Sequence, residues 1–334
     1  MLLEHGADPN STYSVTYLDG QVEGPNPVIY GPAGHTNFPE LAELLLKAGA
    51  NPDEKEALYH STEFPDHRCT RLLLQYGARP TKWGALHHQL DRDDLAGVKL
   101  LLEAGADPNG TYENLGTALH HAIIRGRSGA FVELLLQSGA DPSRTDTSGR
   151  NAAQIARRFG NLDALRALKA PVEEEGMSPR DAFLAACARA DETRARSLLK
   201  SNPILMQSLS EEDRKLLATF AELGKIEAVK LMLDLGFDVN QAGEWGPAIQ
   251  HAAWHAQTDL VKLFIGRGAN LEAENRYGGT ALGCALYATQ FWKCAGDEYV
   301  PVVEALLEAG STVKPYHLTM GNEAVTEVVK AYAE

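Results

Sequence analysis

The sequence predicts an all-α solenoid of stacked helix pairs joined by short hairpin fingers. The first observation behind this prediction is an internal repeat. A segment of the form Leu-Leu-x-x-Gly-Ala-Asp-Pro-Asn recurs along the 334 residues, as at 2–10, 101–109 and 135–143. The second is the i, i+3, i+4 spacing of apolar residues within each unit, which indicates helices with one buried face. Because so small a unit cannot bury that face alone, neighbouring units must stack into a continuous core.

The predicted elements are clearest in "TALHHAIIRGRSGAFVELLLQSGAD" at 117–141. Leu119, Ala122 and Ile123 lie on one helical face, and the second half of the stretch repeats that spacing. Gly126 separates the two helices, and Gly139 closes the second, where a left-handed residue is wanted. Each unit is therefore expected to be a short helix, a second helix and a turn.

The repeat varies along the chain. Between the turn glycines Gly139 and Gly236 the Gly-Ala-Asp signature is lost, although the helical pattern continues. Near the start, "YSVTYLDGQVE" alternates around Asp19-Gly20 like a hairpin with a tight turn. The expected organisation is a partial first repeat with a long finger, regular repeats, degenerate repeats, regular repeats and a C-terminal capping helix, at 1–26, 27–150, 151–224, 225–315 and 316–334.

The units resemble ankyrin repeats. Thr117-Ala118-Leu119-His120, Gly126 and Gly139-Ala140-Asp141 match that family's motif position by position, with Ala118 where proline is usual. The similarity extends over nearly the whole chain, and "YGGTALGCALY" at 277–287 resembles variants common in bacterial ankyrin arrays. This resemblance implies a protein-binding concave face built from the inner helices and the fingers.

Composition narrows the choice of partner. The chain carries 45 acidic and 31 basic side chains, and the resulting net charge of -14 repels phosphate backbones, so nucleic acid is not expected as a ligand. No apolar run approaches the ~20 residues of a membrane span, so no membrane partner is expected either. The four cysteines form no CxxC pair, which favours a reducing cytoplasm over a disulfide framework.

A column of histidines runs through the early repeats. His60, His88 and His121 occupy the same slot in three successive units, a slot that ankyrin repeats leave variable and that faces the concave groove. We expect these three rings to be exposed and to contact a partner. His87 and His120 precede two of them, and the resemblance implies that they bond to neighbouring backbone instead.

Further partner contacts are expected from arginines and aromatics. Arg92 and Arg125 lie four residues after His88 and His121, on the same helical face, where they could clamp a carboxylate. Aromatic residues also precede the inner helices, at the expected finger tips, and large aromatics dominate interface energetics. These aromatic candidates are Trp83, Trp245 and Tyr277.

An alternative reading places chemistry on the histidines. His251 and His255 are four residues apart on one helix, the spacing that zinc enzymes use for two ligands, and Cys284 takes the matching slot of the following unit. The group could be a zinc site or a Cys-His nucleophile pair. In the early repeats, two adjacent rings of the column could also share an ion.

Catalytic signatures of known type are missing from the sequence, which has no GxSxG, no phosphate-binding glycine loop and no HExxH. The preferred hypothesis is a non-enzymatic, bacterial, cytoplasmic scaffold or regulator that needs no cofactor and binds a protein partner in its concave groove. The alternative is a metal-dependent hydrolase, with zinc, built on the concave-face histidines.

Overall fold

The computed structural model describes residues 3–16, 22–54, 56–82, 84–113, 115–173, 176–243, 245–291 and 296–333. The chain divides into two compact units, Met1–Glu173 and Glu174–Glu334, called here the N-terminal unit and the C-terminal unit. The boundary falls inside the degenerate segment 151–224.

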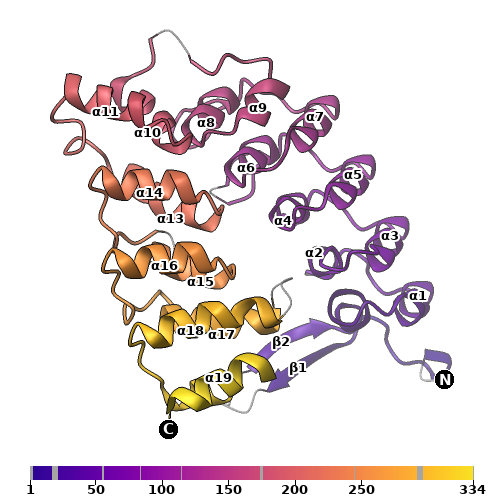
Figure 1. The fold of residues 1–334 in the computed structure, drawn as a ribbon. Coiled ribbons are helices and arrows are strands. Elements are labelled where there is room, and N and C mark those ends of the chain that lie inside the picture. Colours follow the sequence, from indigo (N-terminus) through magenta and orange to yellow (C-terminus); the bar gives the residue numbers. More distant parts are fainter. Residues whose placement is uncertain are drawn as a thin grey trace. The chain divides into compact units, whose positions relative to one another are not determined.

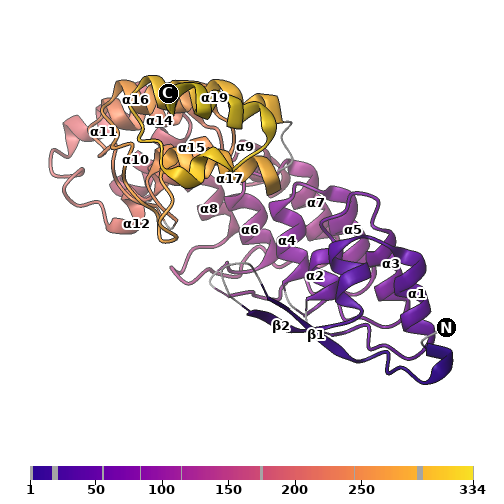
Figure 2. The ribbon, with the colours of Figure 1, turned by 90° about the horizontal axis from the view of Figure 1, so that it is seen from below.

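The N-terminal unit begins with a one-turn helix, η1 (Leu3–His5), and an antiparallel hairpin of β1 (Thr12–Thr16) and β2 (Val22–Pro27) (Figure 2). The predicted hairpin strands are confirmed, while the predicted turn at Asp19-Gly20 lies outside the described residues. The long first finger is thus a two-stranded ribbon ahead of the first helix pair.

Helix pairs follow in an inner and an outer row (Figure 1). Along the inner row α2 packs on α4, α4 on α6 and α6 on α8, while α1 packs on α3, α5 on α7 and α7 on α9 in the outer row. The pairs are η2 (Gly31–His35) with α1 (Pro39–Lys47), α2 (Ala57–Ser61) with α3 (Arg68–Gln75), α4 (Ala85–Asp91) with α5 (Leu95–Glu103), α6 (Ala118–Ile124) with α7 (Gly129–Gln137), and α8 (Ala152–Arg158) with α9 (Leu162–Ala167).

Small side chains let the inner helices approach one another. Each of α2, α4 and α6 opens with an alanine followed by a leucine, and both residues are buried in all three helices. The outer helices also contribute buried leucines, among them Leu101 and Leu135. The core therefore lies between the two rows and continues from one repeat to the next, as the spacing of apolar residues predicts.

The turns are tied to their neighbours by asparagine. Asn109 donates from Nδ2 to the carbonyl of Gly139 (2.7 Å), and its Oδ1 accepts from the backbone N–H of Asp141 (2.8 Å). Gly139 has a φ of 93°, which a side chain would strain. Asn10 makes the same pair of bonds to the following turn. The repeated Gly-Ala-Asp-Pro-Asn segment thus fixes the position of each turn relative to the next one through hydrogen bonds.

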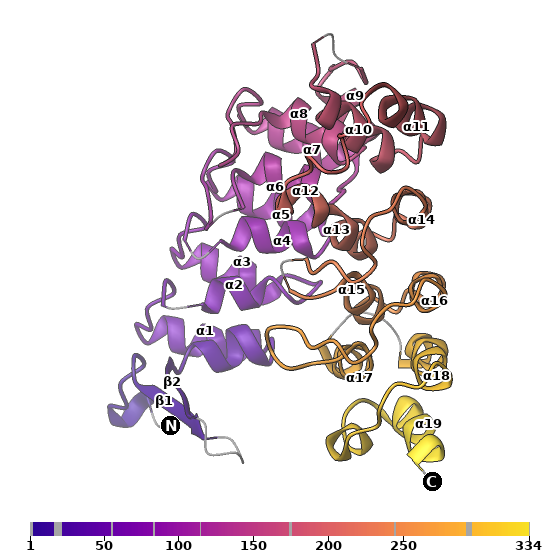
Figure 3. The same ribbon diagram turned by 90° about the vertical axis from the view of Figure 1, so that its left-hand side faces the viewer.

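The C-terminal unit continues the same plan, with α13, α15 and α17 in one row and α14, α16 and α18 in the other (Figure 3). Its elements are α10 (Pro179–Ala188), α11 (Glu192–Ser201), α12 (Glu211–Arg214), α13 (Leu216–Glu222), α14 (Ile226–Asp234), α15 (Ala248–Trp254), α16 (Thr258–Gly266), α17 (Ala281–Phe291), η3 (Gly296–Tyr299), α18 (Val300–Glu308), η4 (Pro315–Leu318) and α19 (Glu323–Ala333).

One inner helix of this unit is lengthened. Helix α17 runs for 11 residues where α15 has 7, because the chain continues helical through 288–291. Residues 292–295 lie outside the described ranges. Beyond them, Tyr299 is fully buried, and its hydroxyl donates to the carbonyl of Trp254 (2.7 Å). Tyr299, the last residue of η3, is therefore anchored on the preceding repeat.

The predicted all-α solenoid of helix pairs is confirmed, including helices within the degenerate segment. Within the described ranges, no helix has both the length and the apolar character needed to cross a membrane.

Candidate functional site

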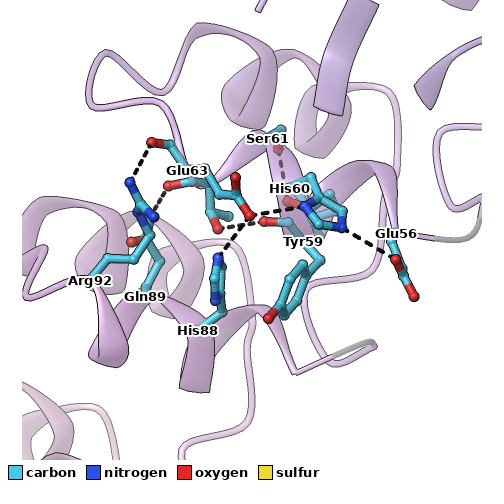
Figure 4. A network of polar contacts seen from close by, with 10 residues as sticks. Glu56, Tyr59, His60, Ser61, Glu63, His88, Gln89 and Arg92 are labelled. Carbon is cyan, nitrogen blue, oxygen red and sulfur yellow. Dashed lines mark hydrogen bonds and ion pairs between the residues drawn. The ribbon is translucent and has the colours of Figure 1, made fainter. Parts of the chain in front are cut away.

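Polar side chains from two adjacent inner helices of the N-terminal unit meet in one network (Figure 4). Nδ1 of His60 lies 2.9 Å from Oε1 of Glu63, and Nε2 of the same ring lies 3.3 Å from Oε2 of Glu56. Nε2 of His88, on α4, lies 3.3 Å from the same Glu63 oxygen. One carboxylate therefore joins the histidines of two successive repeats.

Helical spacing explains the local part of this network. Glu56, at the N-terminal end of α2, and Glu63, just past its last turn, stand four residues before and three residues after His60. Residues at these separations lie on one face of a helix. The side-chain exposed fractions are 27% for His60, 35% for Glu63 and 15% for His88. The network is therefore half-buried and reachable from solvent.

Aromatic rings support the same surface. The ring of Tyr59 stacks on that of His88 with centroids 4.0 Å apart and meets His60 edge-on at 4.9 Å. The ring of Tyr30 also meets His60 edge-on, at 5.4 Å. These contacts fix the imidazoles in place. They leave less side-chain freedom to be lost when a partner binds.

A second carboxylate continues the pattern to the next repeat. Oδ1 of Asp91, the last residue of α4, lies 2.8 Å from Nε2 of His121 and 2.8 Å from Nε of Arg125. Asp91 stands three residues after His88, just as Glu63 stands three residues after His60. In both cases the carboxylate reaches the histidine of the following repeat.

The pairing shifts proton affinities. Burial opposes ionisation of Glu63, but the hydrogen bonds from His60 and His88 lower its pKa to about 2. Burial likewise opposes a charge on His60, yet Glu63 and Glu56 raise its pKa above the usual value. For Asp91, burial is outweighed by His121 and Arg125, so the pKa of this carboxyl is lowered. The carboxylates are thus ionised acceptors.

Burial also shifts the pKa values of two residues next to the network, His87 and Tyr59. Burial, and then the nearby His121, lower the pKa of His87 to about 4. Burial, and then the nearby Asp91, raise the pKa of Tyr59 to about 12. At neutral pH His87 is therefore uncharged and Tyr59 is a protonated phenol.

The predicted exposed histidine column is only partly correct. His60 and His88 are half-buried, but His121 is 4% exposed, so the expectation that its ring is exposed is wrong. Its ring is held by Asp91 and lies 5.5 Å from that of His87, within a helix covered on both sides by α4 and α8. His121 therefore acts inside the repeat stack.

The two preceding histidines behave as the resemblance implies. Nε2 of His87 lies 3.0 Å from the carbonyl of Gly116, and Nε2 of His120 lies 3.0 Å from that of Arg144. Both rings are buried. Gln250 takes this slot in the C-terminal unit and donates to the carbonyls of Ala273 and Gly279.

The two predicted arginines are engaged within the chain. Arg125 binds the carboxylate of Asp91, and Nη2 of Arg92 donates to the carbonyl of Glu63 (3.1 Å). The carboxylate that Arg125 binds therefore belongs to this chain, and the expected contact of both arginines with a partner stays a prediction. Arg92 thus borders the Glu63 network, while Arg125 contacts the carboxylate that leads to the next repeat.

The predicted aromatic contacts lie in different places. Trp83 lies outside the described residues. In the C-terminal unit Trp245 is 43% exposed and Tyr277 is 73% exposed, as expected for finger tips. Whether a partner uses these residues stays a prediction.

The predicted zinc or nucleophile group does not assemble as expected. Cys284 is buried, its thiol accepts from Nδ2 of Asn275 (3.4 Å), and burial raises its pKa to about 11. His251 faces Glu222, with Nδ1 3.5 Å from Oε2. His255 ends α15 as its C-cap residue. Throughout the described ranges no three His, Cys, Asp or Glu side chains are grouped so as to hold an ion.

The sequence analysis did not predict that the carboxylates Glu63 and Asp91 link the histidines of successive repeats. Their signal was present in the chain, since each follows a column histidine by three residues. Glu222 repeats the arrangement in the C-terminal unit, where it follows Thr219 by three residues and faces His251 of the next repeat. Chemically, the N-terminal network offers hydrogen-bond acceptors, donors and flat rings, and it holds no activated nucleophile.

Comparison with known proteins adds two family matches. Residues 86–179 match the model described as "Ankyrin repeats (3 copies)", and residues 217–265 match "Ankyrin repeats (many copies)". No curated protein matches the sequence. Among solved structures, the human ASB11 ankyrin repeat domain is similar at 24% identity, over 69% of this chain and 99% of that one, with a TM-score of 0.32.

Proposed function

Because this chain is an ankyrin-repeat protein, and such repeats are generally protein–protein interaction modules, we propose that it binds a protein partner and acts as a scaffold or regulator. The partner contacts the inner-helix face of the N-terminal unit. This face comprises Tyr59, His60, Glu63 and His88, with Glu56 and Arg92 at its rim.

The observation that carries this proposal is the half-buried network centred on Glu63. Its groups come from two successive repeats, are held by one another, and are still reachable from solvent. Such preorganised polar and aromatic groups bind with little loss of side-chain freedom. The net charge of -14 supports a protein rather than a nucleic acid as the ligand.

The proposal extends to a cytoplasmic location, because Cys69, Cys187 and Cys284 are free thiols, as in a reducing compartment. Bacterial origin rests on the resemblance at 277–287 alone. The metal-dependent hydrolase is not proposed, since no observation within the described ranges favours it.

A charge-reversal experiment tests the surface. The double substitution Glu56→Lys, His60→Glu should reduce capture of the specific partner from a lysate of the source cells at least tenfold, because it inverts the rim of the network. The matched control is Glu103→Lys on the outer helix α5, where the side chain is 64% exposed. Circular dichroism should show unchanged helix content in both variants. Equal capture by both variants would place the interface elsewhere.

A further inference from the structure

Two neighbouring fingers of the C-terminal unit carry a stack of three exposed side chains. The rings of Trp245 and Tyr277 lie nearly parallel, with centroids 6.3 Å apart and an interplanar angle of 14°. The guanidinium carbon of Arg276 lies 3.6 Å from the centroid of Trp245 and 4.9 Å from that of Tyr277. We name this group the finger stack.

The finger stack is built on rigid backbone. Oδ1 of Asn275 accepts from the backbone N–H groups of Tyr277 (2.9 Å) and Gly279 (3.0 Å), and its Nδ2 donates to the sulfur of Cys284 in α17. The two fingers also touch closely at Gly246, where an added Cβ would lie 2.9 Å from Cβ of Asn275. The stack is therefore preorganised rather than assembled on binding.

The charge of Arg276 has no acidic partner among the residues that the structure describes. Its side-chain contacts are the two rings and the hydroxyl of Tyr277, to which Nη2 donates (2.7 Å). The acidic side chains of the same finger point to the following finger, where Glu272 accepts from the N–H of Thr312 and Glu274 pairs with Lys314.

From this arrangement we infer that the finger stack is a docking point for an acidic side chain, Asp or Glu, next to an apolar residue in an extended segment of the protein partner. The rings cover the face of the Arg276 guanidinium and hold its plane, while its edge keeps N–H donors for a carboxylate. Trp245 and Tyr277 offer the apolar contact area. The inference rests on the proposed protein-binding function.

The net charge of -14 makes this a short-range contact. Repulsion between an acidic chain and an acidic partner is screened beyond roughly 8–10 Å at physiological salt. Within that distance, the directional hydrogen bonds of a guanidinium decide the interaction. An acidic residue is thus recognised at this finger and disfavoured near Glu56 and Glu63 of the other unit.

The test uses the full chain and a displayed library of random twelve-residue peptides whose ends are fused or amidated, so that only side chains supply carboxylates. Selected peptides are synthesised, and their affinity is measured by fluorescence anisotropy. Arg276→Gln removes the charge and keeps a flat group on Trp245, and Arg276→Lys keeps the charge without the planar fork. The matched control is Arg196→Gln, an exposed arginine on α11 of the same unit.

We expect a set of peptides whose affinity falls at least tenfold in Arg276→Gln, falls less in Arg276→Lys and is unchanged in Arg196→Gln. These peptides should carry Asp or Glu beside an apolar residue. Replacing that residue by Asn or Gln should weaken binding to the native chain but add no further loss in Arg276→Gln.

Other outcomes separate the two proposals. Peptides that bind the native chain but ignore Arg276, or that lack an acidic residue, overturn the finger stack as a carboxylate site and leave the protein-binding function standing. Recovery of no Arg276-dependent peptide also overturns the inference. If the chain captures neither peptides nor a protein from the lysate, the proposed function falls as well.

Discussion

The two units use the same repeat but place their chemistry on different parts of it. In the N-terminal unit the slot that follows the family histidine carries His60, His88 and His121, and carboxylates link these rings from repeat to repeat. In the C-terminal unit the slot carries Thr219, His251 and Cys284. There Thr219 bonds within its own helix, Cys284 is buried, and His251 meets the carboxylate of Glu222 at the longer distance of 3.5 Å.

The fingers show the reverse distribution. The C-terminal unit displays Trp245, Arg276 and Tyr277 on its fingers, all three exposed. In the N-terminal unit, described finger residues such as Asn109 and Arg79 are engaged in bonds from one turn to the next. Because backbone geometry is set by the buried alanines, leucines and turn glycines, the exposed slots are free to vary. A repeat fold can therefore move its binding chemistry from helix to finger without changing its core.

The largest expected effect concerns the buried side chain that bonds to the backbone of the neighbouring repeat. This side chain is His87 in the N-terminal unit and Gln250 in the C-terminal unit. Buried His87 has a pKa of about 4, whereas an unfolded histidine titrates near 6.5, so the unfolded state binds more protons between these values. The free energy of unfolding therefore loses nothing through His87 above pH 6.5. It falls as the pH drops toward 4, and at pH 5 the loss is about 2 kcal/mol. Replacing His87 with Gln, the residue of the equivalent Gln250, should remove this loss.

The converse substitution, Gln250→His, should introduce acid sensitivity into the C-terminal unit, because it places a buried imidazole against the carbonyls of Ala273 and Gly279. Hydrogen exchange at pH 7 and pH 5, followed separately in α4 and α15, measures both effects. Identical pH dependence in the native chain and in His87→Gln would contradict the assignment of the acid-sensitive group.

The second prediction compares the carboxylates that link repeats. Asp91→Asn leaves Arg125 and His121 with a neutral partner and should lower the local stability of α4 and α6 by about 1–2 kcal/mol, less than for a fully buried ion pair. Glu222→Gln should have a smaller effect on α13 and α15, about 0.5 kcal/mol, because its contact to His251 is longer, at 3.5 Å.

Hydrogen exchange of the amides in each helix pair provides the measurement for both variants. Glu103→Gln, on the exposed side of α5, is the control and should change neither region. If Glu222→Gln proved as damaging as Asp91→Asn, the carboxylate link would be equally important in both units, and the contrast drawn between them would fail.

The smallest effect concerns the pH profile of the Glu63 network. The raised pKa of His60 adds stability that is present below about 6.5 and is lost as pH rises through its folded value. The lowered pKa of Glu63 adds stability that is present above about 4.5 and is lost as pH falls toward 2. Both contributions are therefore complete between pH 4.5 and 6.5.

Glu63→Gln should remove both contributions to the free energy of unfolding. The loss should be less than about 1 kcal/mol, because the groups are partly exposed to solvent. Urea unfolding of the native chain and the variant at pH 5.5 and pH 8.5, monitored by exchange in α2, measures the change. A difference that is larger at pH 8.5 than at pH 5.5 would contradict the assigned pKa shifts.

Much of this architecture follows from the chain alone. The recurring Gly-Ala-Asp-Pro-Asn turn and the i, i+3, i+4 spacing are local patterns, so they predict the helix pairs, the turns and the stacking of neighbouring units. The backbone-binding role of His87 and His120 also follows, because the motif places them in the same slot in each repeat.

What only the tertiary structure decided is which side chains meet across repeats. The sequence shows that Glu63 follows His60 by three residues, but the distance from Glu63 to His88 depends on how α2 packs on α4. The burial of His121 likewise depends on the helices on either side of it. Arg276 has no acidic partner among the described residues because Glu272 and Glu274 bond to the next finger instead. Helical periodicity specifies neighbours within one helix, whereas contacts between helices depend on packing, which no spacing in the sequence records.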